Sequence, residues 1–298
     1  MADQKQAVDL WIDGKRAAPA TGKYFIDRNP DDDSAYAEVA EGAASDMDRA
    51  VQSADAAFAS YRETLAAERE GWLAKAAALV EKYQDDFIDI LVDEVGSPLG
   101  KAHFEVRYAI HCLRAAAGVA RRVTGQTMPS ETPGRFSLSV REPLGVIASI
   151  TPFNVPLLKN VKLSSTPLAT GNTVVMLPSE EAPMVASRLA EIYHEAGIPP
   201  GAFNVVTGFG EQIGDALTTH PLVKVVMFTG SSRVGRHIAS LCGPLMRRVV
   251  LELGGKSPLV VLADADLEAA VEAAAFSQFF FQGQACMAAS RIFVERGI

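Results

Sequence analysis

The second half of the chain alternates short β-rich runs with helical segments, and this alternation restricts the fold more than any other sequence feature. The β-rich runs cover residues 145–150, 173–177, 202–206, 223–228 and 249–251. Two of the helical patterns that separate them cover residues 183–196 and 232–241. Successive parallel strands need a crossover connection, which is usually a helix. We therefore predict an α/β fold built on a parallel sheet.

A helical region over residues 45–122 precedes this alternation. Its apolar residues recur at helical spacing, as in Val51, Ala54, Ala57 and Phe58. Ser45 and Asp48 have the spacing of a capping box at its start. A second amphipathic run over residues 72–95 ends before Pro98, because proline cannot continue the backbone hydrogen bonding of a helix. We interpret these helices as packing elements.

Residues 124–142 have a different character from the segments on either side. Turn-forming residues come first, namely Gly125, Pro129, Pro133 and Gly134. Alternating apolar residues follow, namely Phe136, Leu138 and Val140. This pattern predicts an exposed ribbon or edge strand that leaves the main body.

The composition excludes several classes of protein. The 298 residues are 48% hydrophobic, which is enough for a large core in two units, and the formal net charge is −8. Nucleic acids and anionic membranes select clustered Lys and Arg, so neither is an expected partner. Met1 to Val8 is polar, and no stretch approaches the ~20 apolar residues of a membrane helix. We therefore expect a soluble, cytoplasmic protein.

Three cysteines lie far apart in the sequence. No Cys-x-x-Cys pair and no His at zinc-ligand spacing accompany them, so neither a disulfide framework nor a metal site is predicted. Cys112 and Cys242 lie in helical patterns and are expected to be buried. Cys286 follows an apolar helix in a Gly-containing turn, where backbone dipoles could activate a thiol. The alternative for Cys286 is an ordinary buried cysteine.

Two further segments could carry chemistry. Residues 228–235, Phe-Thr-Gly-Ser-Ser-Arg-Val-Gly, follow an apolar strand and open a helix, so their backbone N–H groups could bind a pyrophosphate. The alternative is a purely structural turn. Glu252 stands between two leucines before a Gly pair, where burial could raise its pKa and make it a general base. The alternative is an ordinary ion-paired glutamate.

In combination and in order, six segments resemble the aldehyde dehydrogenase superfamily from about Ile12 to the chain end. They are residues 150–156, 169–175, 203–206, 228–235, 251–258 and 283–286. The resemblance implies a Rossmann-type cofactor domain, the start of a second α/β domain, and oxidation of a small-molecule aldehyde to a carboxylic acid. A thiol acyltransferase or esterase is a different interpretation, since a Cys with an oxyanion hole makes thioesters without a dinucleotide. The turn at 228–235 argues against it.

The resemblance implies three catalytic residues. Cys286 matches the nucleophile that attacks the aldehyde and forms a thiohemiacetal and then a thioester. Asn154 matches the oxyanion-hole amide, although an Asn that caps a turn is the structural alternative. Glu252 matches the base that activates water for thioester hydrolysis.

The resemblance also implies a cofactor site. Its cofactor-binding candidates are Thr151, Pro152, Phe153, Glu180, Gly230, Ser231, Gly235 and Leu253. Glu180 matches the acid that often holds the adenosine ribose hydroxyls, and an acid there disfavours a 2′-phosphate, so NAD is expected and NADP is possible. Leu177 stands where the family usually has a Lys that bonds the ribose, and Leu has no donor.

Four segments define the expected domain organisation. Residues 1–123 and 143–253 form the dinucleotide-binding domain, and residues 124–142 form an oligomerisation ribbon. Residues 254–298 begin a catalytic domain that is incomplete by comparison with the family, because the Glu-Ile-Phe-Gly-Pro motif that positions the nicotinamide ribose is absent. We expect homo-oligomers of a full-length form, and a catalytically incomplete cofactor-binding or subunit-interaction fragment is the alternative function.

Overall fold

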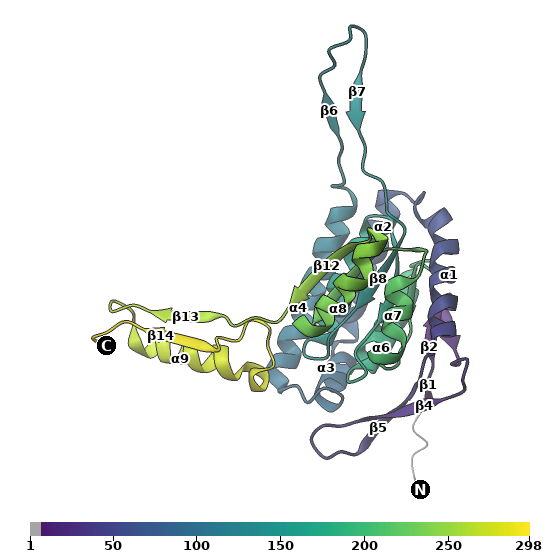
Figure 1. The fold of residues 1–298 in the computed structure, drawn as a ribbon. Coiled ribbons are helices and arrows are strands. Elements are labelled where there is room, and N and C mark those ends of the chain that lie inside the picture. Colours follow the sequence, from purple (N-terminus) through teal and green to yellow (C-terminus); the bar gives the residue numbers. More distant parts are fainter. Residues whose placement is uncertain (1–6) are drawn as a thin grey trace.

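The computed structural model describes residues 7–298, and its centre is a seven-stranded sheet (Figure 1). The strand order is β12 (Arg248–Leu253), β11 (Val223–Gly230), β8 (Val146–Ile150), β9 (Thr173–Leu177), β10 (Phe203–Val205), β2 (Leu10–Ile12) and β3 (Lys15–Ala17). The first five strands are parallel, and β2 and β3 extend the sheet as antiparallel strands. The parallel α/β sheet predicted from the sequence is therefore confirmed. Most of the polar segment Met1 to Val8 lies outside the described residues.

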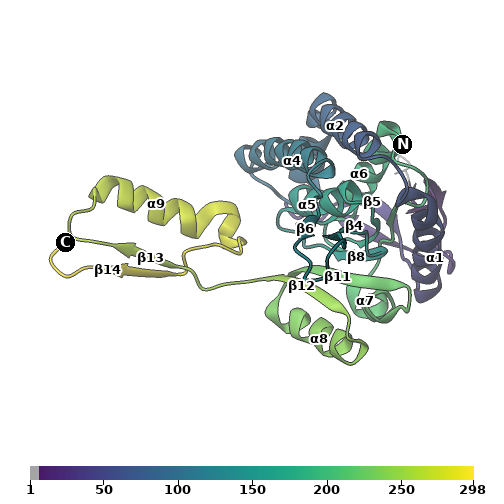
Figure 2. The same ribbon diagram turned by 90° about the horizontal axis from the view of Figure 1, so that it is seen from above.

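Helices cover both faces of this sheet (Figure 2). One layer consists of α1 (Ala44–Tyr61), α7 (Gly210–Thr219) and α8 (Ser232–Cys242). The other contains α2 (Ala66–Lys82), α3 (Gln84–Asp93), α4 (Leu99–Ala120), α5 (Pro156–Ala169) and α6 (Pro183–Ala196). Alternate residues of a strand enter the two cores: Ile147 packs with the second layer, and Val146 and Ala148 pack with the first. This alternation is what a central strand buried on both faces requires.

The amino-terminal region differs from its prediction in two ways. Residues 7–40 contain strands that the sequence analysis did not predict, of which β1 (Ala7–Val8), β5 (Ala35–Ala40) and β4 (Tyr24–Arg28) form a separate sheet. The predicted capping box of Ser45 and Asp48 is wrong. Helix α1 begins at Ala44, and the carboxylate of Asp46 accepts the Ala43 N–H at 2.9 Å. The carboxylate of Asp48 pairs instead with His220 at 3.0 Å.

The ribbon predicted over residues 124–142 is present as two antiparallel strands, β6 (Gln126–Met128) and β7 (Ser137–Ser139). It extends away from the body, as Figure 1 shows. Its apolar side chains are open to solvent, and Phe136 and Val140 are 76% and 71% exposed. Nothing in residues 7–298 covers them.

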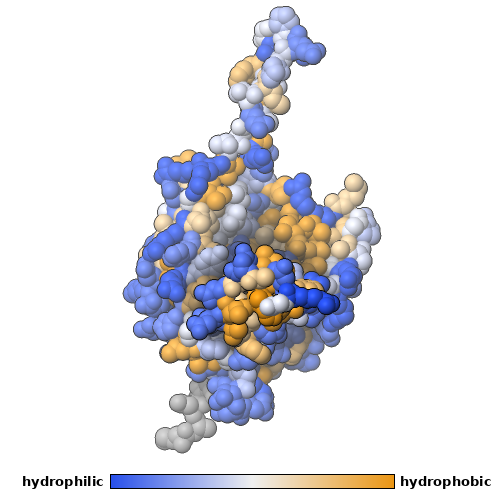
Figure 3. Space-filling model, turned by 90° about the vertical axis from the view of Figure 1, so that its left-hand side faces the viewer, coloured by the Kyte–Doolittle hydropathy of each residue, from blue (hydrophilic) through white to orange (hydrophobic). Residues whose placement is uncertain are grey.

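The carboxy-terminal segment forms a smaller βαβ unit. Strands β13 (Pro258–Val261) and β14 (Arg291–Val294) are parallel, and α9 (Leu267–Phe279) and the short 3-10 helix η2 (Phe280–Gly283) connect them. The unit projects from the body on an extended connection (Figures 1 and 2). Hydrophobic residues gather on the projecting unit where it faces the viewer in Figure 3. Helix α9 has no buried residue, and its exposed apolar side chains include Val271, Phe276 and Phe279.

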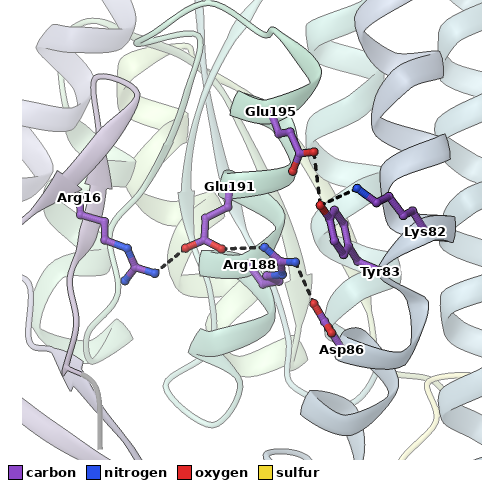
Figure 4. Close-up of polar contacts among 7 residues, drawn as sticks. All are labelled: Arg16, Lys82, Tyr83, Asp86, Arg188, Glu191 and Glu195. Atoms are coloured by element: carbon purple, nitrogen blue, oxygen red, sulfur yellow. Dashed lines mark hydrogen bonds and ion pairs between the residues drawn. The ribbon is translucent and has the colours of Figure 1, made fainter.

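A surface network joins the helical layer to the added strand β3 (Figure 4). Arg188 on α6 pairs with Asp86 at 2.8 Å and with Glu191 at 3.0 Å, and Glu191 also pairs with Arg16. The Arg188 guanidinium lies 4.8 Å from the centre of the Tyr83 ring. The partners are partly exposed, so each pair contributes at most about 1 kcal/mol of stability.

The described part of the chain holds neither a membrane-spanning helix nor a metal cluster. No helix within residues 7–298 is both long and apolar enough to cross a membrane. The same residues contain no group of three or more His, Cys, Asp or Glu side chains arranged to hold a metal ion.

Candidate functional site

A cleft of about 530 Å³ opens at the carboxyl ends of β8, β9 and β11, between α7 and α8. Six of the expected cofactor residues line it, namely Thr151, Pro152, Phe153, Glu180, Gly230 and Ser231. The carboxyl ends of parallel strands are the usual ligand-binding edge of an α/β sheet, because the chain turns there from each strand into its helix. The cleft therefore lies where the sheet topology favours a dinucleotide.

The turn from β11 into α8 forms one wall of the cleft. Gly230 ends the strand, and a Cβ atom on it would lie 2.4 Å from the ring of Phe228, so any other residue would displace that ring. Ser231 caps the helix, and its hydroxyl accepts the Val234 N–H at 3.3 Å. The positive end of the α8 dipole consequently faces the cleft, as an anion such as a pyrophosphate requires.

Gly235 and Leu253 lie outside the residues that line the cleft. A Cβ atom on Gly235 would lie 2.6 Å from the Leu253 side chain, so glycine here lets α8 pack closely against β12. The two residues that the family pattern connects with the cofactor thus contact each other beneath the turn.

Three buried hydroxyl groups line the cleft without a hydrogen-bond partner in the described chain. They belong to Thr151, Thr218 and Thr229. A buried hydroxyl usually has a partner, because leaving it unpaired costs roughly 1–3 kcal/mol. The oxygen atoms are buried, so a polar ligand in the cleft would satisfy them once the side chains turn toward it. Leu177 also lines the cleft and is 1% exposed, so it contributes apolar surface only.

The cleft also has polar residues that were not predicted as site residues, including Glu211, Arg233, Asp215 and His237. His237 on α8 lies 2.8 Å from the carboxylate of Asp215 on α7, so this pair bridges the two helices that flank the cleft. Arg233 stands within the 228–235 segment, but no role was predicted for it. No motif marks the other three, which are exposed residues of α7 and α8.

Asn154 and the turn of Cys286 lie together although 132 residues separate Asn154 from Cys286 in sequence. The Asn154 side chain donates to the backbone oxygen of Gln284 at 2.7 Å. An amide has two N–H donors, so a second one stays available for an oxyanion. Cys286 is half-buried, and the Ala288 N–H closes its turn by donating to the Ala285 oxygen at 3.0 Å. Asn154 therefore holds the loop of the expected nucleophile.

The same loop is anchored in α4. Phe280 packs against Phe104 with ring centres 6.4 Å apart, and Phe281 is 4% exposed beneath the Lys101 ammonium at 4.4 Å. Phe281 and Gln282 have φ angles of 47° and 53°, in the left-handed region that costs a non-glycine residue about 1–3 kcal/mol. The anchoring holds the turn in this conformation.

Glu252 on β12 forms an ion pair with Lys159 on α5. The burial expected for Glu252 is wrong, because its side chain is 50% exposed while that of Lys159 is 9% exposed. β12 is the edge strand of the sheet, so its outer surface is open. Gly255 then brings the chain next to Cys286, since a Cβ on it would lie 3.3 Å from the Cys286 oxygen.

Lys159 is the residue of this site that the sequence analysis missed. Burial lowers its pKa, and the neighbouring Lys162 lowers it further, whereas Cys286 raises it. Its partner Glu252 stands three residues before Gly255, which lies against the Cys286 backbone, so the ammonium belongs to the same site. A signal was present in the sequence, because Lys159 interrupts the apolar run that follows Asn154.

The cysteines outside the site differ from each other. Cys242 is 1% exposed at the end of α8, as predicted. Cys112 on α4 is only half-buried, so its predicted burial is wrong, and burial nevertheless raises its thiol pKa.

Comparisons with known proteins agree with this geometry. A model of the aldehyde dehydrogenase family matches residues 17–298. The chain belongs to this family. It is 38% identical to a vanillin dehydrogenase of Corynebacterium glutamicum over 97% of the chain, and 36% identical to a glutarate-semialdehyde dehydrogenase of Pseudomonas aeruginosa, also over 97%. The chain spans 59% and 60% of the lengths of these two relatives.

A solved structure of the family has the same fold. The chain superposes on an NAD-dependent aldehyde dehydrogenase from Sinorhizobium meliloti with a TM-score of 0.96 and 37% identity. The match covers 99% of this chain and 59% of the other. The aldehyde-dehydrogenase-like α/β fold expected from the sequence is therefore confirmed.

Proposed function

We propose that this chain carries the cofactor cleft, nucleophile and base of an NAD(P)+-dependent aldehyde dehydrogenase. The observation that carries the proposal is the hydrogen bond from Asn154 to Gln284, because it joins the expected oxyanion donor to the turn of the expected nucleophile. Family membership supplies the reaction class, and the geometry supports the roles of the individual residues.

The proposed reaction begins at Cys286. Its thiolate attacks the aldehyde carbon, and the carbonyl oxygen becomes an anion that the free N–H of Asn154 and the Cys286 backbone N–H stabilise. A bound nicotinamide would supply the hydride acceptor, which converts this adduct into a thioester. Glu252 then takes a proton from water, whose oxygen attacks the thioester carbon. The acid leaves and the thiolate of Cys286 is restored.

The cleft residues fit a dinucleotide. Ser231 and the first turn of α8 would bind the pyrophosphate, and the unpaired hydroxyls of Thr151 and Thr229 would bond to the cofactor. Glu180 lines the cleft, and its carboxylate would accept from ribose hydroxyls and repel a 2′-phosphate. These features favour NAD over NADP.

We propose the same domain organisation that the sequence suggests. Residues 1–123 and 143–253 form the dinucleotide-binding domain, and residues 254–298 belong to the catalytic domain. Residues 124–142 form a ribbon for contact with a second copy in a homo-oligomer, since its apolar side chains have no partner within the described chain.

A single-turnover assay tests the function. The chain is mixed with excess NAD, or NADP in a separate run, and with aliphatic and aromatic aldehydes, and reduced nicotinamide is followed by its absorbance. We expect a burst that disappears in Cys286→Ala and persists in Cys112→Ala, the half-buried control. Glu252→Gln should keep the burst and lose the later turnover. Equal bursts in Cys286→Ala and the parent chain would refute the proposal.

A further inference from the structure

Lys159 places a nearly buried positive charge in the proposed catalytic site. Its side chain is 9% exposed, and it pairs with Glu252. Within residues 7–298, no other carboxylate forms an ion pair with this ammonium. Removing a charge from water is costly unless a partner compensates for it. Lys159 therefore keeps its charge most readily while an anion lies beside it.

The anion beside Lys159 is the carboxylate of Glu252, which is also the proposed general base. Glu252 must take a proton from water in the proposed reaction, and an ammonium on its carboxylate makes it a weaker base. Its side chain is 50% exposed, so it can turn toward solvent while Lys159 cannot. A second anion at Lys159 would release Glu252 for its role and keep the ammonium neutralised.

We propose that Lys159 selects aldehydes that carry an anionic group, such as a carboxylate, by binding that group in place of Glu252. The inference rests on the proposed function and names its substrate class. Lys159 follows Asn154 by five residues at the start of α5, and its partner Glu252 stands three residues before Gly255, where an added Cβ would lie 3.3 Å from the Cys286 oxygen. An aldehyde held by its anionic group at Lys159 consequently has its carbonyl near the nucleophile and the oxyanion donor.

Overall sequence similarity does not assign this substrate. The chain is nearly equally identical to relatives named for vanillin and for glutarate semialdehyde, and only the second aldehyde carries a carboxylate. The Lys159 ammonium is therefore more informative about the substrate class than the sequence identity to either relative.

The test uses alkylation of Cys286, which needs neither cofactor nor turnover. Iodoacetate is anionic and iodoacetamide is neutral, and both transfer a carbon to the thiolate and release iodide. Peptide mass spectrometry gives the rate at each cysteine, and the ratio of the two rates at Cys286 reports the local charge. We expect Lys159→Met to lower this ratio about tenfold, as the loss of one charge-assisted hydrogen bond implies, and Lys159→Arg to retain most of it.

Lys162 supplies the matched control, because it lies three residues further along α5 and is exposed. Lys162→Met removes the same charge from the chain and should change the ratio less than about twofold, as expected for a solvent-screened charge. An unchanged ratio in Lys159→Met, or an equal fall in Lys162→Met, would overturn the inference. Glu252→Gln serves if Lys159→Met does not fold: freeing the ammonium should raise the ratio, and an unchanged ratio would count against it.

Two ligands complete the test. The carboxylated aldehyde 4-oxobutanoate should protect Cys286 from iodoacetamide at about tenfold lower concentration than butanal does, and Lys159→Met should abolish this difference. Equal protection by both aldehydes would refute the substrate class. The proposed function fails separately, and would do so if Cys286 reacted no faster than Cys112 and no aldehyde protected it.

Discussion

Replacement of Lys101 by methionine tests whether the buried ion pair of α4 supports the site. Lys101 and Glu105 lie 2.6 Å apart with side chains 1% and 0% exposed, so water does not screen them. The carboxylate of Glu105 also accepts the N–H of Leu158 at 3.1 Å, at the start of α5 beyond Asn154. In Lys101→Met, this carboxylate would be buried without its cation, which is among the most damaging single changes.

Protonation of Glu105 limits the loss of stability in Lys101→Met and makes this loss depend on pH. Burial raises the pKa of Glu105 and Lys101 lowers it, so Lys101→Met leaves the folded-state pKa well above the ordinary value of 4.5. When the pKa of a carboxyl group is higher in the folded state than in the unfolded state, the protein keeps its full stability below the unfolded-state pKa. Its free energy of unfolding then falls as the pH rises toward the folded-state pKa. Breaking a buried ion pair costs about 3 kcal/mol or more, so we expect a loss of that order at pH 7 and a clearly smaller loss at pH 5.

Urea unfolding at both pH values measures this loss. Arg114→Met is the control on the same helix, because Arg114 and Glu81 are both more than half exposed and their pair should contribute at most about 1 kcal/mol. Lys101→Met combined with Glu105→Leu should recover much of the stability, since no unpaired charge remains. A loss that is equal at pH 5 and pH 7, or equal to that of Arg114→Met, would refute the reasoning.

Three other predictions concern stability and assembly. Burial raises the pKa of Asp27 from 3.8 to about 6, so the stability that its protonated form contributes is lost as the pH rises through 6. Asp27→Asn should remove up to about 3 kcal/mol of this pH dependence in urea unfolding, whereas Asp31→Asn, at an exposed position, should not. Gly201 has φ of 78° and an added Cβ would lie 2.9 Å from the Ser53 oxygen, so Gly201→Ala should cost about 2 kcal/mol, and an unchanged thermal midpoint would contradict this. Phe136→Ser should leave the thermal midpoint unchanged and weaken self-association in light scattering, and a lowered midpoint would place Phe136 in the core instead.

The sheet could be predicted because its signals are local. Helix α6 occupies the predicted residues 183–196, since Pro183 fits the first helical turn and Gly197, at φ of 99°, ends the helix in a left-handed conformation. The strands of residues 7–40 were missed because they are short and their pairing depends on distant partners, such as Trp11 with Val205. Local sequence does not encode such a register.

In the candidate site, too, residues in local motifs could be predicted and residues that depend on long-range contacts could not. Cys286, Glu252 and Asn154 could be proposed from the sequence because each lies in a recognisable segment, and the structure brings their neighbourhoods together. Lys159 was missed because its importance arises from an ion pair across 93 residues of sequence. The expected burial of Glu252 failed for a related reason: flanking leucines indicate a strand, but they do not show that β12 is at the edge of the sheet.

A ligand that contacts both the projecting βαβ unit and the body would restrict the motion of one relative to the other. Cys286, the proposed nucleophile, lies in that unit, and the proposed cofactor cleft lies in the body. The two parts are joined by the extended connection, by the hydrogen bond from Asn154 to Gln284, and by the aromatic contacts with α4. A molecule that touches both sides adds a crosslink to this joint, and part of its binding free energy goes into ordering the joint. Amide hydrogen exchange in β13 and β14 should therefore slow when ligands bind at a site that neither strand forms. We expect the distance between Cys286 and the cleft to change when such a ligand binds.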